Sequence, residues 1–206
     1  MGGKNNRFPL FCALVFLVAL IVSAISPKDY FTWFLEVFPA IIALALLVFT
    51  YRSFRLTNLA YGLILLHSII LMVGGHYTYA EVPPGNWAKD WFGMERNNYD
   101  KVGHFAQGFI PALVIREIFI RKQVVSTKGW RNFIIVCVCL AISAVYEFIE
   151  WFVAEASGQE AEAFLGTQGY VWDTQSDMLC AALGAIAALL VLAQWHNAQL
   201  KRFVLN

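Results

Sequence analysis

Apolar residues along this chain form long, nearly unbroken runs, not stripes that recur on one face of a helix. Each run approaches the roughly 17–25 residues that a helix needs to cross a bilayer. The bilayer interior offers the backbone no hydrogen-bond partners, so such runs should be helical. We therefore predict an all-α membrane protein, a single bundle of six transmembrane helices within one domain, residues 1–206. The predicted spans are 8–25, 31–50, 58–79, 102–120, 132–153 and 177–195.

Composition agrees with this prediction, because 59% of the 206 residues are hydrophobic and only 14% are charged. Soluble domains typically carry about 25% charged residues. Lys4 and Arg7 precede the first span, and small residues follow at 22–24, a pattern shared with cleaved signal peptides. Its apolar run is long for a signal peptide, so we favour an anchor. All four cysteines lie within predicted spans, which argues against a disulfide framework.

Charged residues separate the two sides of the predicted bundle. The segments with basic but no acidic residues are the N-terminus, 51–57, 121–131 and the stretch after 195. The acid-rich loops are 26–30, 80–101 and 154–177. Because Lys and Arg in short loops set topology, both termini should be cytoplasmic and the acidic loops periplasmic. The basic residues are scattered flanks, and they give no support for nucleic-acid binding.

Polar residues gather at the predicted outer ends of four different helices. Asp100, His104 and Gln107 follow i, i+4, i+7 spacing and so share one helix face. Glu147 and Glu150 share a face of the fifth span. Ionisable groups inside spans are costly and normally face the bundle interior or a wet cavity. The sequence therefore predicts a polar site at the periplasmic end.

Histidine with several carboxylates allows three kinds of chemistry. It can hold a divalent metal, which is the cofactor that these residue types suggest; it can supply a general acid and base; or it can relay protons. We assign candidate catalytic roles to His104, Glu147, Glu150 and Asp177. The metal-binding candidates are His76, His104, Glu150 and Asp177. The candidates for substrate binding are Asp100, Lys101, Gln107, Thr167, Gln168, Asp173 and Tyr77, with Thr167 and Gln168 on a glycine-flanked loop that could close over the site.

Purely structural roles are the alternative for several of these residues. Asp173 can cap the sixth helix, and Asp177 is favoured by the helix dipole. Lys101 can form an ion pair with the glutamates of the fifth span. His67 is expected to be a packing residue, and His196 a residue flanking the last span on the cytoplasmic side.

Four stretches in order resemble the bacterial inner-membrane family of the YjdF type, whose function is unknown. They read GGHYTYAEVP, YDKVGHFAQGF, EFIEW and GTQGYVWDTQSDM, and the resemblance covers nearly the whole chain. The resemblance implies a multi-pass protein of the bacterial inner membrane.

A second resemblance is to the VanZ-like superfamily, whose named member is linked to teicoplanin resistance. It rests on the D-K-x-x-H-F start of the fourth span, on Glu147 and Glu150, and on the start of the last span. Asp177 stands where asparagine is usual and Cys180 where glycine is usual, so glycopeptide resistance is not inferred. What the resemblance implies is a polar, envelope-facing site shared by three helices.

These observations predict a protein that binds or acts on a membrane lipid or a lipid-linked cell-envelope precursor. Two alternatives stay open. One is a transporter of ions or small molecules, which would need a polar path to the cytoplasm. The other is a structural or assembly protein, in which the acidic cluster only locks helices together.

Overall fold

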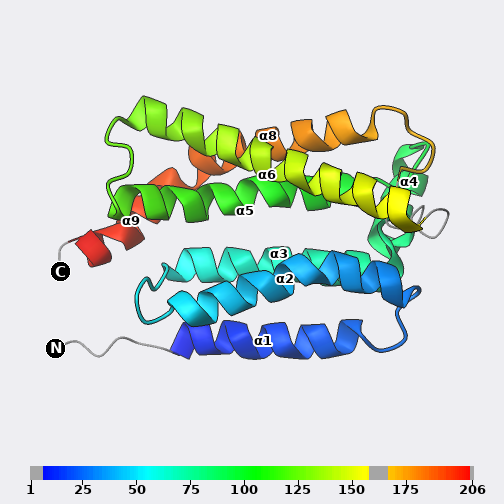
Figure 1. Ribbon diagram of the computed structural model, residues 1–206, viewed down its shortest axis with the longest axis horizontal. Helices are drawn as coiled ribbons and strands as arrows, with labels where there is room; N and C mark the ends of the chain where they lie inside the picture. The colour runs from blue at the N-terminus through cyan, green and yellow to red at the C-terminus, as the bar shows by residue number, and fades with distance from the viewer. Residues whose placement is uncertain (1–6, 158–166, 205–206) are drawn as a thin grey trace.

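The computed structural model describes residues 7–157 and 167–204, which fold as helices with no strand among them. The long helices lie side by side and are connected at the two ends of the bundle (Figure 1). They are α1 (Arg7–Ser23), α2 (Tyr30–Thr50), α3 (Asn58–Tyr77), α5 (Tyr99–Arg121), α6 (Lys128–Ser157) and α8 (Asp173–Val191). The shorter elements are the 3-10 helix η1 (Tyr79–Glu81), α4 (Pro83–Phe92) and α9 (Ala193–Val204).

Each predicted span overlaps one long helix, so the all-α prediction is confirmed. Four helices, α2, α3, α6 and α8, are long and apolar enough to cross a membrane. The apolar helix α1 is shorter, with 17 residues. Helix α5 has 23 residues and carries charged side chains near both of its ends.

Two features differ from the prediction. The sixth span was expected to reach residue 195, but α8 ends at Val191 and α9 begins at Ala193, where polar residues enter the sequence. No helix was expected at 83–92, where α4 forms. Pro83 and Pro84 occupy its first turn, in which the missing N–H groups of proline cost no helical hydrogen bond.

Backbone contact between α5 and α8 is the tightest packing in the bundle. A Cβ added at Gly108 would lie 1.7 Å from the carbonyl oxygen of Ala181. One added at Gly184 would lie 2.1 Å from the carbonyl oxygen of Phe105. Small residues allow helices to approach this closely without a side chain between them. The first turns of α5 and α8 are consequently held side by side.

Helices α1, α2 and α3 pack together, and so do α5, α6 and α8. Contact between α3 and α5 connects the two groups (Figure 1). The ring of Tyr79 fills the space between α3 and α5 at one end of this contact. Its atoms would lie 2.5 Å from a Cβ at Gly74 and 3.0 Å from one at Gly103. Two glycines therefore make the room in which η1 anchors its aromatic side chain.

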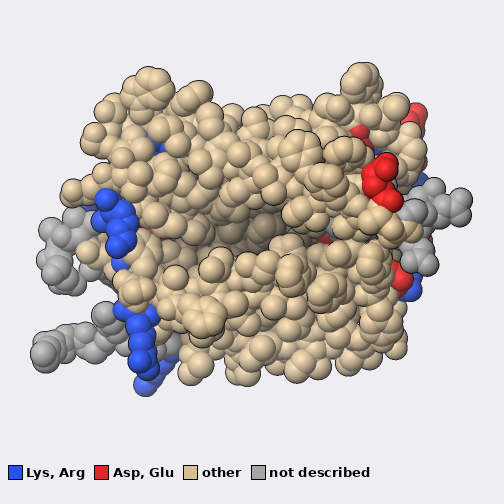
Figure 2. All heavy atoms as spheres, viewed as in Figure 1, with Lys and Arg blue, Asp and Glu red and all other residues tan. Residues whose placement is uncertain are grey.

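Charged residues occupy the two ends of the molecule and leave a broad uncharged band between them (Figure 2). On the face shown, most Lys and Arg lie at the end that carries both termini, and most Asp and Glu lie at the opposite end (Figures 1 and 2). The band exposes large apolar side chains, among them Leu14, Phe49 and Leu190. Such a surface suits the hydrocarbon core of a bilayer.

A buried ionic cluster ties three helices together at the basic end. The Glu117 carboxylate accepts hydrogen bonds from the backbone N–H of Thr57 at 3.0 Å and from Arg121 at 2.7 Å. His196 Nε2 lies 3.2 Å from Glu117, and its Nδ1 lies 2.9 Å from Arg116. His196 follows the last long helix, as expected, but it is completely buried instead of lying at the surface. The cluster fixes α9 against α5.

We expect Gly108→Ala to lower the free energy of unfolding by about 1–3 kcal/mol, because one methyl group must push α5 away from α8. Gly129→Ala is the matched control, since a Cβ at Gly129 meets nothing within 4 Å. It should be neutral or stabilising by about 0.5–1 kcal/mol. Unfolding in detergent micelles measures both. Equal stability of the two variants would contradict the close α5–α8 contact.

Candidate functional site

Lys101 connects the first turns of α5 and α8. Its Nζ lies 2.6 Å from Asp173 Oδ1 and 2.6 Å from Asp177 Oδ1. Asp100 Oδ2 lies 3.8 Å from the same nitrogen. All four side chains are mostly buried, so these charge-assisted bonds are little screened by water. The two aspartates are spaced one turn apart on α8, which lets a single ammonium group bridge both.

Arg96 supplies a second cation, which contacts Asp173 and Asp100. Its guanidinium lies 2.8 Å from Asp173 Oδ1 and 3.7 Å from Asp100 Oδ2. It also donates a 2.7 Å hydrogen bond to the carbonyl oxygen of Thr167. Asp173 therefore contacts both cations, and Arg96 links the segment before α8 to the segment before α5.

Gln168 ties the same two segments together by a reciprocal pair of hydrogen bonds. Its Oε1 accepts from the backbone N–H of Asn97 at 3.1 Å, and its Nε2 donates to the Asn97 carbonyl at 2.8 Å. Thr167 and Gln168, predicted to form part of a closing loop, are in this structure attached to Arg96 and Asn97. Of the two glycines that flank this pair, Gly169 is described and Gly166 lies outside the described residues.

His104 lies one turn deeper on α5 and is surrounded by side-chain oxygens. Its Nε2 lies 3.3 Å from Asp100 Oδ1 and 3.9 Å from Asp177 Oδ1. Its Nδ1 lies 3.1 Å from Gln107 Oε1 and 3.8 Å from Glu147 Oε1. The i, i+4, i+7 spacing of Asp100, His104 and Gln107 thus places both neighbours against the ring, as the sequence predicted.

Three glutamates extend the site toward α2 and α6. Glu147 and Glu150 are both buried, and both come from the face of α6 that their spacing predicted. Glu36 of α2 is buried as well, and it accepts a 3.3 Å hydrogen bond from the hydroxyl of Tyr146. Among the described residues, Glu147 Oε1 has no hydrogen-bond partner. The site therefore contains more carboxylates than cations.

The phenol of Tyr79 lies beside this cluster, on the turn outside the long helices. Burial raises the pKa of Tyr79 well above its usual value, and the neighbouring Glu36 carboxylate raises it further. The hydroxyl group consequently stays neutral and can donate a hydrogen bond to a carboxylate or to a bound ligand.

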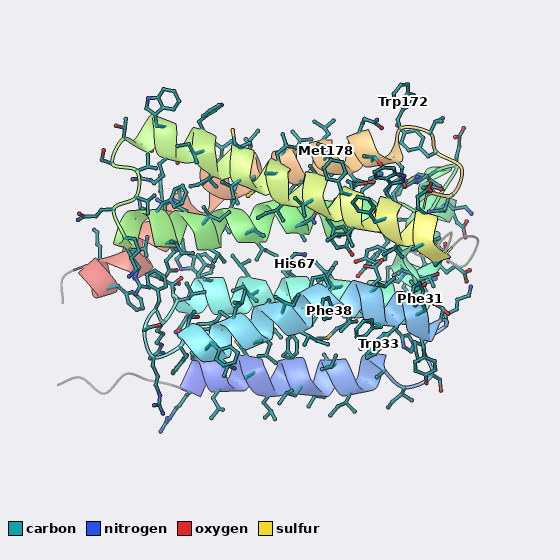
Figure 3. The ribbon with its side chains drawn as sticks, in the orientation of Figure 1. Phe31, Trp33, Phe38, His67, Trp172 and Met178 are labelled. Carbon is teal, nitrogen blue, oxygen red and sulfur yellow. The ribbon has the colours of Figure 1, made fainter. Side chains whose placement is uncertain are left out.

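A cavity of about 170 Å³ lies against these groups, between α2, α3, α5 and α6. Its polar wall includes Asp100, His104, Gln107 and Glu150, and its apolar wall includes Ile142. Figure 2 shows the face of the bundle hollowed between the layers that Figure 1 labels α2 and α6. His67 lines the cavity from α3, and Figure 3 shows it on the side of α3 that faces α5.

A groove of about 380 Å³ lies on the other side of α6, between α6 and α8. Glu147, Trp151, Thr174 and Met178 line it, and Figure 3 labels Met178 on α8. Glu150 lines both the groove and the cavity. This carboxylate is therefore reached from two different faces of the bundle.

The structure brings together most of the residues that sequence analysis selected. The residues found in or directly against the cluster are Asp100, Lys101, His104, Gln107, Glu147, Glu150, Asp173 and Asp177. Lys101 pairs with aspartates of α8 and not with the glutamates of α6, of which Glu147 lies 3.8 Å from His104.

His76 and Tyr77 do not join the cluster. His76 Nδ1 lies 3.0 Å from the carbonyl oxygen of Ser23, at the end of α1. Tyr77 is 41% exposed and packs edge-on against the His76 ring. The metal set that includes His76 is therefore not assembled here. Asp100, His104 and Asp177 instead offer ligand atoms that all lie within 4.8 Å of one another.

Sequence reasoning did not select Arg96, Tyr79 or Tyr146. Arg96 precedes α5, so helical spacing gave no signal for it, and its contacts with Asp100 and Asp173 depend on how the segment before α5 folds. No signal existed for the two tyrosines either. Their positions depend on glycines of α3 and α5 and on the approach of α2 to α6.

Comparison with known proteins gives two matches that agree. Residues 8–198 match a family described as "Predicted membrane protein (DUF2238)". The chain is 54% identical over 191 residues to the Inner membrane protein YjdF of Escherichia coli (strain K12), covering 93% of this chain and 91% of that protein. No solved structure matches the chain. These matches support the YjdF-type resemblance and lend no support to the VanZ-like one.

We expect Lys101→Met to lower the free energy of unfolding by about 3 kcal/mol, because it leaves Asp173 and Asp177 buried without their shared ammonium group. Adding Asp173→Asn to this variant should restore part of the loss. Lys89→Met is the control, since the described residues show no carboxylate paired with Lys89, and it should unfold like the wild type. Unfolding of all four proteins in detergent gives the answer. A Lys101→Met protein as stable as the wild type would show that the bridge contributes nothing.

Proposed function

This chain belongs to the DUF2238 family of predicted membrane proteins and is a bacterial inner-membrane protein, and we propose that it binds and chemically modifies a membrane lipid or a lipid-linked envelope precursor. In this proposal α1, α2, α3, α5, α6 and α8 all cross the bilayer, with both termini in the cytoplasm. The His104 cluster then lies at the periplasmic end, in the outer leaflet.

The distribution of charge supports this orientation. Lys and Arg border the apolar band at the end where both termini lie (Figure 2). Acidic residues and the His104 cluster lie at the other end. Positive residues are retained on the cytoplasmic side of inner-membrane proteins, so the acidic end faces outward.

The observation that carries the proposal is a buried histidine–carboxylate cluster that lines a cavity on the apolar side of the bundle. His104 and Glu150 line the cavity together with Leu71 and Ile142. The cavity lies between α2 and α6, within the apolar band of Figure 2, so a ligand can enter it from the bilayer. An acyl or prenyl chain suits the apolar wall of the cavity, and a polar headgroup suits its polar wall.

The charges around the cavity indicate what that headgroup carries. Lys101 and Arg96 are already paired with aspartates, whereas Glu36 and Glu150 present carboxylates to the cavity. A surplus of carboxylates disfavours an anionic group and favours hydroxyl or ammonium groups. His104, held between Asp100 and Gln107, can exchange a proton with such a hydroxyl.

A transport function is less well supported by the same structure. It requires a polar path from the cavity to the Glu117 cluster at the opposite end. Completely buried apolar residues, Ala112, Leu113, Ile135 and Cys139, occupy the core between α3, α5, α6 and α8. Charge transfer through such a layer is unfavourable, so an enzyme-like site at one end is preferred.

We expect Ile142→Trp to remove the lipid that copurifies with the protein, because the larger side chain fills the 170 Å³ cavity. The matched control is Leu190→Trp, which adds the same group at a side chain that is 76% exposed. Mass spectrometry of protein extracted into nanodiscs compares the bound lipids. Equal lipid retention by both variants would rule out the cavity as the binding site.

We expect Glu150→Gln and His104→Gln each to reduce conversion of a bacterial inner-membrane lipid extract at least 100-fold, while both proteins still fold. Removal of a general acid or base typically costs about 10²–10⁴-fold in rate. The assay follows lipid species by mass spectrometry after incubation with protein in nanodiscs, with a thermal melt of each variant beside it. Joint loss of stability and conversion would instead favour the helix-locking role.

A further inference from the structure

Three metal-ligating atoms converge beside the cavity. His104 Nε2 lies 3.3 Å from Asp100 Oδ1 and 3.9 Å from Asp177 Oδ1, and the whole group fits within 4.8 Å. Two ligand atoms held about 2.1 Å from a tetrahedral ion are about 3.4 Å apart. The 3.3 Å and 3.9 Å separations from His104 Nε2 are therefore near the value that a bound ion requires.

The hydrogen bond on the other ring nitrogen determines what His104 offers to this group. Nδ1 lies 3.1 Å from the amide oxygen of Gln107, which is an acceptor, so Nδ1 carries the proton and donates. In the neutral ring Nε2 then presents a lone pair to two carboxylate oxygens. Lys101 already donates to Asp177 Oδ1, but the Nε2 lone pair and Asp100 Oδ1, 3.3 Å apart, have no donor between them in this tautomer. Two acceptors so placed are unfavourable, and a cation between them resolves the conflict. Metal-binding histidines typically show this arrangement, with the second nitrogen donating to a fixed oxygen.

A second and independent observation is an unsatisfied carboxylate on the Nδ1 side of the same ring. Glu147 is 93% buried, and its Oε1 lies 3.8 Å from His104 Nδ1 with no hydrogen-bond partner in the described part of the chain. The nearest cations, Lys101 and Arg96, are engaged by Asp173 and Asp177. Negative charge next to His104 is therefore in excess, and a divalent ion would balance it.

We infer that His104 Nε2, Asp100 and Asp177 bind one divalent metal ion, of the zinc or manganese type that mixed nitrogen and oxygen ligands select. Asp177 Oδ1 faces His104 Nε2 and also accepts from Lys101; because a carboxylate oxygen has two lone pairs, it can bind the ion and keep this hydrogen bond. Asp100 and His104 line the cavity, which leaves the remaining coordination position open to water or to a headgroup hydroxyl. This inference rests on the proposed function, because the metal would act on the lipid bound there. Metal binding itself is measured without any lipid.

The first experiment measures metal in protein purified without chelators, by inductively coupled plasma mass spectrometry. We expect about one zinc or manganese ion per wild-type chain, and at least tenfold less in Asp177→Asn and in Asp100→Asn. Asp90→Asn, on the exposed face of α4, is the control and should keep the wild-type content. Full metal retention by both site variants would overturn the inference.

The second experiment uses wild-type protein treated with EDTA, so that its outcome does not depend on any variant folding. Zinc or manganese added at a small excess should raise the melting temperature by at least 5 °C, because an ion that binds only the folded state stabilises it. The same addition to folded His104→Gln protein should produce no rise. A wild type without metal, whose melting temperature neither ion changes, would overturn the inference. Lipid conversion by such a metal-free protein would leave the proposed function intact with acid–base chemistry alone.

Discussion

Contact between the backbones of α5 and α8 determines how the charged groups of these two helices lie relative to one another. Gly108 and Gly184 remove the side chains that would separate the two helices, so their first turns start at the same level. At that level Lys101 can reach Asp173 and Asp177 at 2.6 Å each. One turn further along, His104 meets Asp177 from the neighbouring helix. Small residues in the core thus position polar residues at the end of the bundle.

Polar groups occur in two separate clusters, one at each end, and each solves the cost of burial differently. At the basic end, the oxygens of Glu117 are matched by donors from Thr57, Arg121 and His196. That network is consistent with a structural role, because every charge has a partner. At the acidic end, Glu147 Oε1 has no partner among the residues described. Incomplete satisfaction of this kind is typical of sites that accept a ligand.

Sequence patterns predicted the long helices and most of the site, because both depend on local spacing. Apolar runs located six helices, and the spacings of Asp100 with His104, and of Glu147 with Glu150, identified faces that do converge. The end of α8 was misplaced because Ala193 and Trp195 extend its apolar pattern past the break at Leu192. His76 was assigned to the site because it ends α3 at the right level, but helix rotation turns it toward Ser23. The depth of a residue along the bundle can be predicted from hydropathy. The direction in which its side chain points depends on how its helix packs against neighbouring helices.

Glu150 borders two compartments, the cavity between α2 and α6 and the groove between α6 and α8. Helix α6 therefore stands between two openings that share one carboxylate. In the proposed function, a molecule released from this carboxylate would not have to retrace the route by which it arrived. Substrate and product would then occupy different sectors of the surrounding lipid, so that one does not obstruct the other.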